Sequence, residues 1–295
     1  MLDLRRLRLL RELAHRGTIA AVAEALSYTP SAVSQQLSAL ERETGVPLLE
    51  RTGRSVTLTP AALRLVEHTE TLLATLAQAT AELATARTEL TGTLRIGAFP
   101  TAVRTILSPA LVSLSRAHPR LELLVTELDP AAAPAALRAE TLDIALVQEY
   151  DYVPMEPEPG LDSEPLLTET IHLAVPGIDA GTENLAAQSD SPWIAGTSGT
   201  LCHTMTVRAC RAAGFTPRIR HHADDFGAVL ALVAAGQGVA LVPDLGALSA
   251  PEGVTLTPLP TRRRTRLAYR RGTGAHPIVA AGRAALHAAV SPAAG

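Results

Sequence analysis

The fold of the N-terminal part of the chain is decided by residues 17–61, GTIAAVAEALSYTPSAVSQQLSALERETGVPLLERTGRSVTLTPA. Thr18 is a suitable N-cap for a short helix over residues 19–26. Thr29 provides a second capped start because a proline follows it at the first helical position, and it predicts a helix over residues 30–44. Two short helices joined by a tight turn are the arrangement of a helix-turn-helix.

Another helix is predicted upstream of this pair. Apolar residues recur there at spacings of three and four: Leu4, Leu7, Leu10 and Ala14. This period predicts an amphipathic helix that ends at Gly17. Residues 1–60 carry eight arginines against six acidic residues, whereas the remainder carries 18 against 23. The basic excess therefore lies in the helical segment, although an imbalance of this size alone supports nucleic-acid binding only weakly.

The predicted helix over residues 30–44 has two faces of different character. Val33, Leu37 and Leu40 form an apolar face that packs. The opposite face carries short polar side chains and one arginine: Ser31, Ser34, Gln35, Ser38 and Arg42. Serine and glutamine are short enough to let a helix enter the major groove, and they can bond to base edges or phosphates. This face predicts DNA binding; the alternative is an ordinary solvated surface.

A β-hairpin is predicted after Gly45. The stretch VPLLERTGRSVTLT, residues 46–59, has two extended apolar patches around a basic turn. Such a hairpin would form a wing and place Arg51 and Arg54 beside phosphates. The alternative is that both are exposed loop arginines without a ligand.

Residues 17–61 resemble the LysR-type transcriptional regulators, a family whose pattern is a serine-containing recognition helix, Leu-Glu, Gly, Leu-x-Arg and a Leu-Thr-x-x-Gly boundary. This chain departs from the pattern at Ala62, where the family usually has glycine, and at Gln35, where arginine is frequent. The resemblance implies a DNA-binding regulator and places the recognition helix and wing. The candidate DNA-binding residues are Thr18, Thr29, Pro30, Ser31, Ser34, Gln35, Ser38, Arg51 and Arg54.

A long helix is predicted over residues 61–90. Thr59 and Pro60 form another capped start, and apolar or small residues then follow a 3,4 repeat for about four heptads. A 3.5-residue period favours a helix partner over a globular core, although packing against its own domain is the alternative. Dimerisation would supply the two half-sites that a helix-turn-helix needs. The predicted dimerisation residues are Leu65, Leu72, Leu76, Leu83 and Leu90.

Strands alternate with helices over residues 91–295. LRIGA, LELLVTEL, DIALVQ and GVALVP are strand-like, and the helical segments between them predict βαβ units in a mostly parallel sheet. The resemblance extends here in pattern, and implies a two-lobed α/β effector domain of periplasmic-binding-protein type. Its chain crosses between lobes near residues 150–165 and 255–270. The expected boundaries are residues 1–60 for an all-α winged helix-turn-helix, 61–90 for the linker, and 91–160 with 268–295 and 161–267 for the two lobes.

An effector site is predicted where helices begin after strands, because helix N-termini and strand carboxyl ends meet there. Three such places are residues 98–102, 196–200 and 224–226. Their threonines and serine could equally be helix caps, and their convergence on one cleft is implied by the resemblance. The candidate effector-binding residues are Phe99, Pro100, Thr101, Gln148, Thr197, Ser198, Thr200 and Phe226. Acidic residues at positions 149, 224 and 225 favour a ligand other than a simple dianion.

Composition excludes several classes of protein. With 47% hydrophobic and 19% charged residues the chain is typical of a globular protein. All 26 basic residues are arginine, which excludes Schiff-base lysines and phosphate-binding loops of the GxxxxGK[ST] type. No long apolar run predicts a membrane span, and arginines interrupt every possible signal core. Two cysteines fit a reducing compartment, so we expect a cytoplasmic protein.

Other motifs carry less weight. Gly236 and Gly238 precede a strand instead of following one and lack a third glycine, so they do not predict dinucleotide binding. The histidines at 221–222 and the acids at 224–225 are read as a polar loop, since their spacing does not match a metal site. GTSGT, residues 196–200, is out of register with a nucleophile elbow. We therefore expect no catalytic residues, metal or cofactor.

The expected partners are double-stranded DNA, a small-molecule effector, a second copy of the chain in a dimer or tetramer, and RNA polymerase; no membrane is expected. Two alternatives remain. One is a two-lobed small-molecule binding protein without a role in transcription. The other is a redox-sensing regulator that uses Cys202 and Cys210, which lie eight residues apart on one predicted helix. That spacing puts them about 12 Å apart along the axis, so a disulfide would require the helix to unfold.

Overall fold

The computed structural model describes residues 1–52, 55–85, 89–177 and 184–290. The chain forms two compact units. The first is Met1–Ala86 with Arg271–His276, and the second is Arg87–Arg270 with Pro277–Gly295. Among the described residues no helix combines the length and apolar character that crossing a membrane requires.

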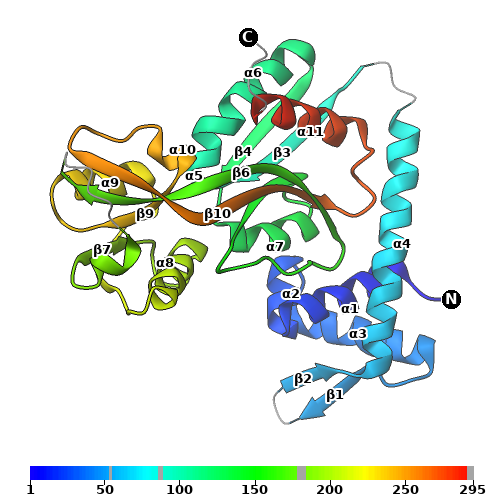
Figure 1. Ribbon diagram of the computed structural model, residues 1–295. Coiled ribbons are helices and arrows are strands. Elements are labelled where there is room, and N and C mark those ends of the chain that lie inside the picture. The colour runs from blue at the N-terminus through cyan, green and yellow to red at the C-terminus, as the bar shows by residue number, and fades with distance from the viewer. Residues whose placement is uncertain (53–54, 86–88, 178–183, 291–295) are drawn as a thin grey trace. The chain divides into compact units, whose positions relative to one another are not determined.

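The first unit begins with three helices, α1 (Leu4–Arg16), α2 (Ile19–Ala25) and α3 (Pro30–Thr44) (Figure 1). Thr18 and Thr29 cap α2 and α3, because each hydroxyl accepts a hydrogen bond from the backbone N–H three residues ahead. α1 and α3 each end at a glycine in the left-handed region, which glycine adopts without strain. The predicted helices are confirmed to within a residue at each end. Their apolar faces share one core.

A hairpin and a long helix complete this unit. β1 (Leu49–Thr52) and β2 (Ser55–Leu58) pair antiparallel, which confirms the predicted hairpin. α4 (Pro60–Ala84) starts at Thr59, whose hydroxyl accepts from the N–H of Ala62 and donates to the carbonyl of Pro47. The prediction of a helix that reaches residue 90 was wrong: α4 ends at Ala84, and Leu90 lies outside it. Thr85 is the C-cap residue, and its hydroxyl donates to the carbonyl of Glu82.

The second unit is built on a six-stranded sheet with strand order β4-β3-β5-β10-β6-β9. Its strands are β3 (Gly92–Ala98), β4 (Leu121–Glu127), β5 (Ile144–Tyr150), β6 (Leu161–Pro176), β9 (Ala240–Pro243) and β10 (Val254–Arg270). A separate parallel pair, β7 (Pro192–Ala195) and β8 (Arg218–His222), meets β9 through a bridge between Trp193 and Val239.

The helices of this unit flank the sheet (Figure 1). They are α5 (Pro100–Ala102), which continues through a π-helical turn (Val103–Leu107) into α6 (Ser108–Ala117), then α7 (Ala133–Arg138), α8 (Leu201–Ala212), α9 (Phe226–Ala234), α10 (Asp244–Ala247) and α11 (Pro277–Val290). Short 3₁₀ turns lie at Pro130–Ala132 and Leu185–Gln188.

The prediction of a mostly parallel sheet was wrong for the six-stranded sheet. β3 pairs parallel with β4 and β5, but β10 is antiparallel to both neighbours and β6 is antiparallel to β9. The reason is that β6 and β10 are long strands that pair with each other along their length. Together they connect the half of the unit that contains β5 to the half that contains β9. The polar loop predicted at 221–222 is also wrong, because both histidines lie at the end of β8.

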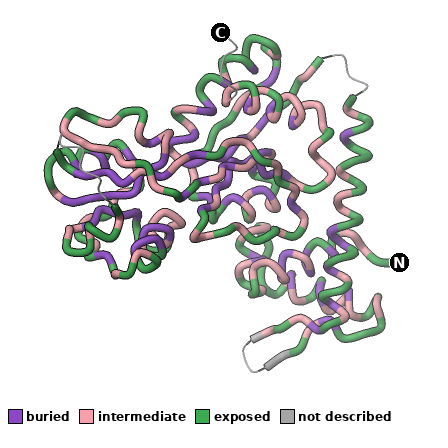
Figure 2. Tube along the Cα trace, viewed as in Figure 1, coloured by how far each residue is buried: buried purple, intermediate pink, exposed green. Residues whose placement is uncertain are grey.

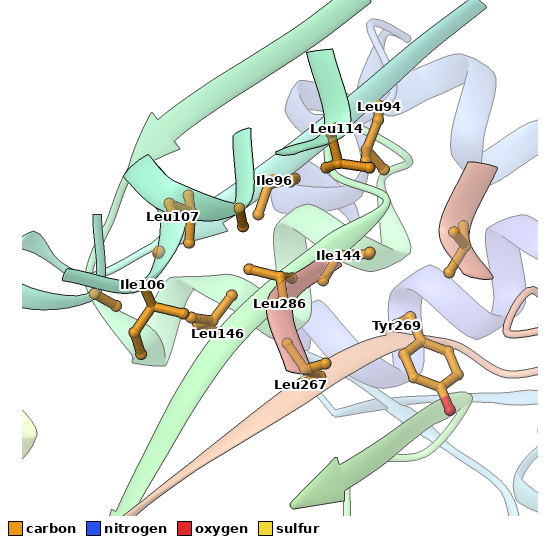
Figure 3. Packing of buried hydrophobic residues seen from close by; sticks show 14 of the residues in the cluster. Leu94, Ile96, Ile106, Leu107, Leu114, Ile144, Leu146, Leu267, Tyr269 and Leu286 are labelled. Atoms are coloured by element: carbon orange, nitrogen blue, oxygen red, sulfur yellow. The ribbon is translucent and has the colours of Figure 1, made fainter. Parts of the chain in front are cut away.

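Burial follows the alternation of side chains along these strands. On β5, Ile144 and Leu146 contribute to a cluster with α6 and α11, whereas Ala145 and Val147 pack on the opposite face with α7. Figure 3 shows the first cluster, in which Ile106 and Leu107 of the π-helical turn approach the sheet. The sheet is thus covered on both faces, and its strand ends are held rigidly at the place where the candidate site lies.

Candidate functional site

One face of α3 is exposed and polar. Val33, Leu37 and Leu40 are buried in the core of the first unit. The predicted residues on the other side are exposed or half-buried: Thr29, Pro30, Ser31, Ser34, Gln35 and Ser38. The amide of Gln35 is exposed and has no hydrogen-bond partner among the described residues, so it is available to a ligand. Thr18, by contrast, uses its hydroxyl to cap α2.

A groove of about 1080 Å³ runs along this face of α3. It is lined by Ser34, Gln35, Ser38 and Arg42 of α3, by Arg6 of α1, and by Gly45, Val46 and Pro47, among others. Arg42 is exposed and makes no ion pair within the described part of the chain, whereas Arg6 is paired with Glu43. The groove therefore offers hydrogen-bonding groups and the guanidinium of Arg42, together with the carboxylate of Glu41, which accepts from the backbone N–H groups of Leu48 and Leu49.

The predicted contacts of the wing cannot be placed as side chains. Arg54 lies outside the described residues, and of Arg51 only the backbone, in β1, is described. The hairpin itself follows α3 directly, so these two positions remain predictions that rest on the sequence and on the observed pairing of β1 with β2.

α4 carries a stripe of exposed leucines. At 100° per residue, four of the predicted dimerisation residues lie within about 40° around the helix axis: Leu65, Leu72, Leu76 and Leu83. Leu72 and Leu76 are each 49% exposed and Leu83 is 78% exposed, while Leu65 is partly packed on the core. Figure 2 shows that much of α4 is exposed. An apolar stripe on an exposed helix is stable in water only when something covers it.

The second unit contains a cavity of about 390 Å³. It is lined by Phe99, Pro100, Thr101, Glu127, Leu128, Asp129, Pro130, Gln148, Thr197, Thr200, Cys202, Asp224, Phe226 and Arg263. Seven of the eight candidate effector residues are therefore brought together, from the ends of β3 and β5 and the starts of α5, α8 and α9. Ser198 is not among them, because it is exposed in the turn that precedes α8.

A buried ion pair lies at the floor of the cavity. Arg263 of β10 and Glu169 of β6 are directly opposite each other and are 0% and 2% exposed. The guanidinium donates to both carboxylate oxygens, from Nε at 2.8 Å and from Nη2 at 3.0 Å. It also donates to Oε1 of Gln148 at 3.2 Å and lies 5.0 Å from the ring centroid of Phe99. Three donors of this arginine are thus engaged within the protein.

Cys202 lies beside this network as a neutral thiol. Its Sγ is 3.2 Å from the hydroxyl of Tyr150 and 3.8 Å from Nε2 of Gln148. Burial raises the pKa of Cys202 above its usual value and raises the pKa of Tyr150 well above its own. Cys210, on the same helix, is buried in the core, and burial raises its pKa to about 12.

Two acidic residues precede α9: Asp224, which lines the cavity, and Asp225, the N-cap of the helix. The carboxylate of Asp224 accepts from the backbone N–H of Thr197 at 2.8 Å and from its hydroxyl at 2.6 Å. Asp225 caps α9 and pairs with Arg104 of the π-helical turn at 2.7 Å. These contacts join the segment before α9 to Thr197 and to the π-helical turn. In the described ranges no group of His, Cys, Asp or Glu is arranged to hold a metal.

Sequence reasoning missed the cavity residues Glu127, Asp129, Cys202 and Arg263. Arg263 stands in TRRRTR, residues 261–266, which suggests an exposed basic stretch. The period-two alternation of Thr261, Arg263, Thr265 and Leu267, all of them buried, is the signal that could have found it. Glu127 is the last residue of the edge strand β4 and Asp129 lies two residues beyond it, and only the three-dimensional arrangement brings them to the cavity.

This arrangement has a match among known protein families. Residues 4–63 match the family described as "Bacterial regulatory helix-turn-helix protein, lysR family", and residues 87–291 match "LysR substrate binding domain". The chain belongs to the LysR family. It is a DNA-binding transcription regulator with an effector-binding domain of the two-lobed α/β type, as the resemblance of residues 17–61 implies.

Individual LysR-family proteins are similar over most of the chain. "Transcriptional dual regulator GltC" of Bacillus subtilis (strain 168) is 29% identical over 252 residues, which covers 82% of this chain and 81% of the relative. A "Probable hydrogen peroxide-inducible genes activator" of Mycobacterium xenopi is 36% identical over 170 residues, covering 58% of this chain and 87% of the relative. The solved structure "Corynebacterium glutamicum OxyR C206 mutant" has a TM-score of 0.56 and 27% identity, covering 98% of this chain and 92% of that one.

Proposed function

We propose that this LysR-family regulator reads operator DNA with α3 as a dimer and responds to a small molecule bound in the cavity of its second unit. The observation that carries the proposal is the exposed polar face of α3, where Gln35 offers an unpartnered amide beside Ser34 and Ser38. A glutamine amide can bond to adenine through two atoms in the major groove. Such a regulator binds the chromosome in the cytoplasm, and it would change transcription by acting on RNA polymerase.

The Gln35→Ala variant is expected to lose about 1–3 kcal/mol of binding free energy on the specific duplex, because it removes one base-edge contact in each half-site. Binding to a scrambled duplex should change little, since phosphate contacts carry non-specific affinity. The measurement is a fluorescence-anisotropy titration at several salt concentrations, on an operator selected from genomic DNA and on its scrambled form.

The matched control for this test is Gln78→Ala. Gln78 is an exposed glutamine on α4 whose amide donates to Glu82 at 3.0 Å, so its loss should leave both affinities unchanged. Melting curves of both variants check that the first unit stays folded. Equal weakening of the two duplexes by Gln35→Ala would remove Gln35 as a base reader.

The dimer is proposed to form through the exposed leucine stripe of α4, with a second copy of α4 as the occupant. Leu65, Leu72, Leu76 and Leu83 follow the spacing of a coiled-coil seam. Each chain has a single recognition helix, so a dimer that binds two half-sites about one helical turn apart gains the affinity that one helix lacks. A small-molecule binding protein without a role in transcription would need neither this stripe nor α3.

The cavity is proposed to hold the effector without catalysing a reaction on it. Its thiol is neutral and its arginine is engaged with Glu169, so neither is placed as a nucleophile or a general acid. No cofactor is proposed. Thr101 and Thr200, at the starts of α5 and α8, are the polar contacts that supported the prediction from sequence, and both line the cavity.

Redox sensing through Cys202 and Cys210 is the second candidate, favoured by the similarity to peroxide-inducible activators. Two observations weigh against it. Both thiols have pKa values raised by burial, so at neutral pH little of either is thiolate, the nucleophilic form. Both also lie on α8 eight residues apart, which places them about 12 Å apart along the helix.

We therefore expect hydrogen peroxide at neutral pH to leave operator affinity unchanged and both thiols countable by a thiol reagent after unfolding. Since both pKa values are raised, reactivity should increase only as the pH rises toward them, with Cys210 titrating near 12. A sample oxidised in denaturant is the control that both thiols can react. A peroxide-induced change in operator binding that disappears in Cys202→Ser would contradict this expectation.

A further inference from the structure

The charge of the cavity lining points to the chemical class of the effector. Three carboxylates line the cavity, those of Glu127, Asp129 and Asp224, and the basic residue in the described lining is Arg263. That guanidinium donates to both oxygens of Glu169 and lies on the ring of Phe99. Its charge is therefore already balanced within the protein, and the cavity keeps an excess of negative charge.

The carboxylates are only partly engaged by the protein. Glu127 has no hydrogen-bond or ion-pair partner among the described residues. Asp129 uses one oxygen, Oδ1, to accept from the N–H of Ala131 at 2.8 Å. Asp224 accepts two bonds from Thr197, which keep it fixed in place without neutralising its charge. Oxygens of Glu127 and Asp129 are thus available to a hydrogen-bond donor in the cavity.

Three helix starts reach the cavity, those of α5, α8 and α9. One N–H of α8 bonds to the hydroxyl of Thr200 and one N–H of α9 bonds to the carboxylate of Asp225, whereas α5, which begins with Pro100, has no side-chain cap. An anionic ligand would meet these helix ends together with three carboxylates. A cation would meet the carboxylates together with the rings of Phe99 and Phe226, which favour an ammonium group.

The cavity lining also includes a hydroxyl group, that of Thr101, without a hydrogen-bond partner in the described residues. Thr101 is only 3% exposed, it lines the cavity, and its hydroxyl has no hydrogen-bond partner among the described residues. Its hydroxyl oxygen is not among the fully buried polar atoms that lack a partner, so it reaches the open space of the cavity and can bond to a ligand or to water. Thr101 is therefore a polar contact for a ligand that does not depend on the carboxylates.

We infer that the effector is a small organic amine, bound as its ammonium form by Glu127, Asp129 and Asp224, with an apolar body against Phe99 and Phe226. This inference rests on the proposed function, in which the cavity holds the effector. A volume of about 390 Å³ suits a molecule of modest size. Simple carboxylates and dianions are excluded from the same cavity by repulsion.

The sign of the charge can be tested without knowing the ligand, because Cys202 lies in the cavity wall. The reagents are two methanethiosulfonates, one with a trimethylammonioethyl group and one with a sulfonatoethyl group. In both reactions the thiolate attacks the sulfenyl sulfur, a disulfide forms and methanesulfinate leaves. The ratio of the two rates cancels the thiolate fraction and so reports the local potential alone. Arg208 separates the two cysteines in a tryptic digest, so mass spectrometry follows Cys202 by itself.

The cationic-to-anionic rate ratio at Cys202 is expected to exceed that of free N-acetylcysteine amide by about tenfold or more. The double variant Glu127→Gln, Asp129→Asn should lower the ratio by about threefold or more, while the double variant Asp190→Asn, Glu252→Gln, the same change of charge at exposed sites outside the cavity, should not. If Cys202 reacts with neither reagent, the ratio is read at Thr101→Cys in a Cys202→Ser background. A ratio at or below that of the free thiol would overturn the inference.

Protection of Cys202 from labelling gives the second measurement. Matched pairs of ligands, benzylammonium with benzoate and pentylammonium with pentanoate, are added before the reagent. At least one ammonium is expected to slow labelling more than its carboxylate partner. A carboxylate that protects better, or the absence of protection by either ammonium, would overturn the inference. Operator binding is measured in neither experiment, so a negative result would not contradict the DNA-binding proposal. Failure of the Gln35 test would likewise not contradict the inference that the effector is an amine.

Discussion

Replacing Arg263 with methionine is expected to lower the free energy of unfolding of the second unit by about 3–5 kcal/mol, because it leaves the carboxylate of Glu169 buried without its ion-pair partner. Glu169 is 2% exposed and would keep only the backbone N–H of Leu245, at 2.9 Å, as a donor. The two residues lie directly opposite each other on β6 and β10, the strands shared by both halves of the unit. No other part of the described sheet brings a charged pair so far from water.

Tryptophan fluorescence measures this loss in the intact chain, since Trp193 is the single tryptophan and is fully buried in the second unit. Urea unfolding followed at that residue therefore reports the right transition. The double variant Arg263→Met, Glu169→Leu is the decisive control, because replacing a whole buried pair by apolar residues is often neutral or stabilising. If the double variant is as unstable as the single one, lost packing, and not the unpaired charge, is responsible.

The first unit could be predicted from sequence because its signals are local. Thr18, Thr29 and Thr59 each stand one residue before a helix, and each cap is formed within three residues. The end of α4 could not be predicted in the same way. The leucine repeat continues to Leu90, but α4 ends at Ala84. A periodic pattern indicates which face is apolar; it does not indicate where the helix stops.

The topology of the second unit was harder to predict because the sequence pattern indicates shorter strands than the observed β6 and β10. Only TIHLAVP and RLAYRR have the apolar character of a buried strand, and the remainder of each strand is polar because it pairs at the junction of the two halves. Pairing partners more than 90 residues apart, such as Glu169 and Arg263, leave no local signal. The antiparallel pairings and the ion pair were therefore missed together, for one reason.

The helix starts that line the candidate cavity were predicted from sequence, whereas the negative charge of its lining was not. Thr101, Thr200 and Phe226 follow a rule about where strands end and helices begin, so they could be named from sequence. Glu127 and Asp129 lie at the end of β4 and just after it, where a carboxylate is ordinarily solvated and does not predict a site. Only the fold, which places β4 at the edge beside β3, brings these acids next to Thr101.

The Leu76→Glu variant is expected to convert the dimer to a monomer and to weaken operator binding by at least about 100-fold, because the second half-site is then no longer bound by a tethered partner. Leu76 is 49% exposed in the single chain, so a glutamate there does not disturb the core of the first unit. In a two-helix seam, however, two such carboxylates would be buried opposite each other without partners.

Leu63→Glu is the matched control for this variant. Leu63 is 51% exposed on the same helix but lies roughly opposite the stripe, about 160° from Leu83 at 100° per residue. The same substitution there adds the same charge to α4 and should leave both mass and operator affinity unchanged. Light scattering gives the mass of each variant, and titration on duplexes with one and two half-sites gives the affinities. Leu76→Glu should bind the two duplexes equally well, because a monomer gains nothing from a second half-site. A variant that remains a dimer and keeps its preference for two half-sites would show that the stripe of α4 is covered by something other than a second copy of the chain.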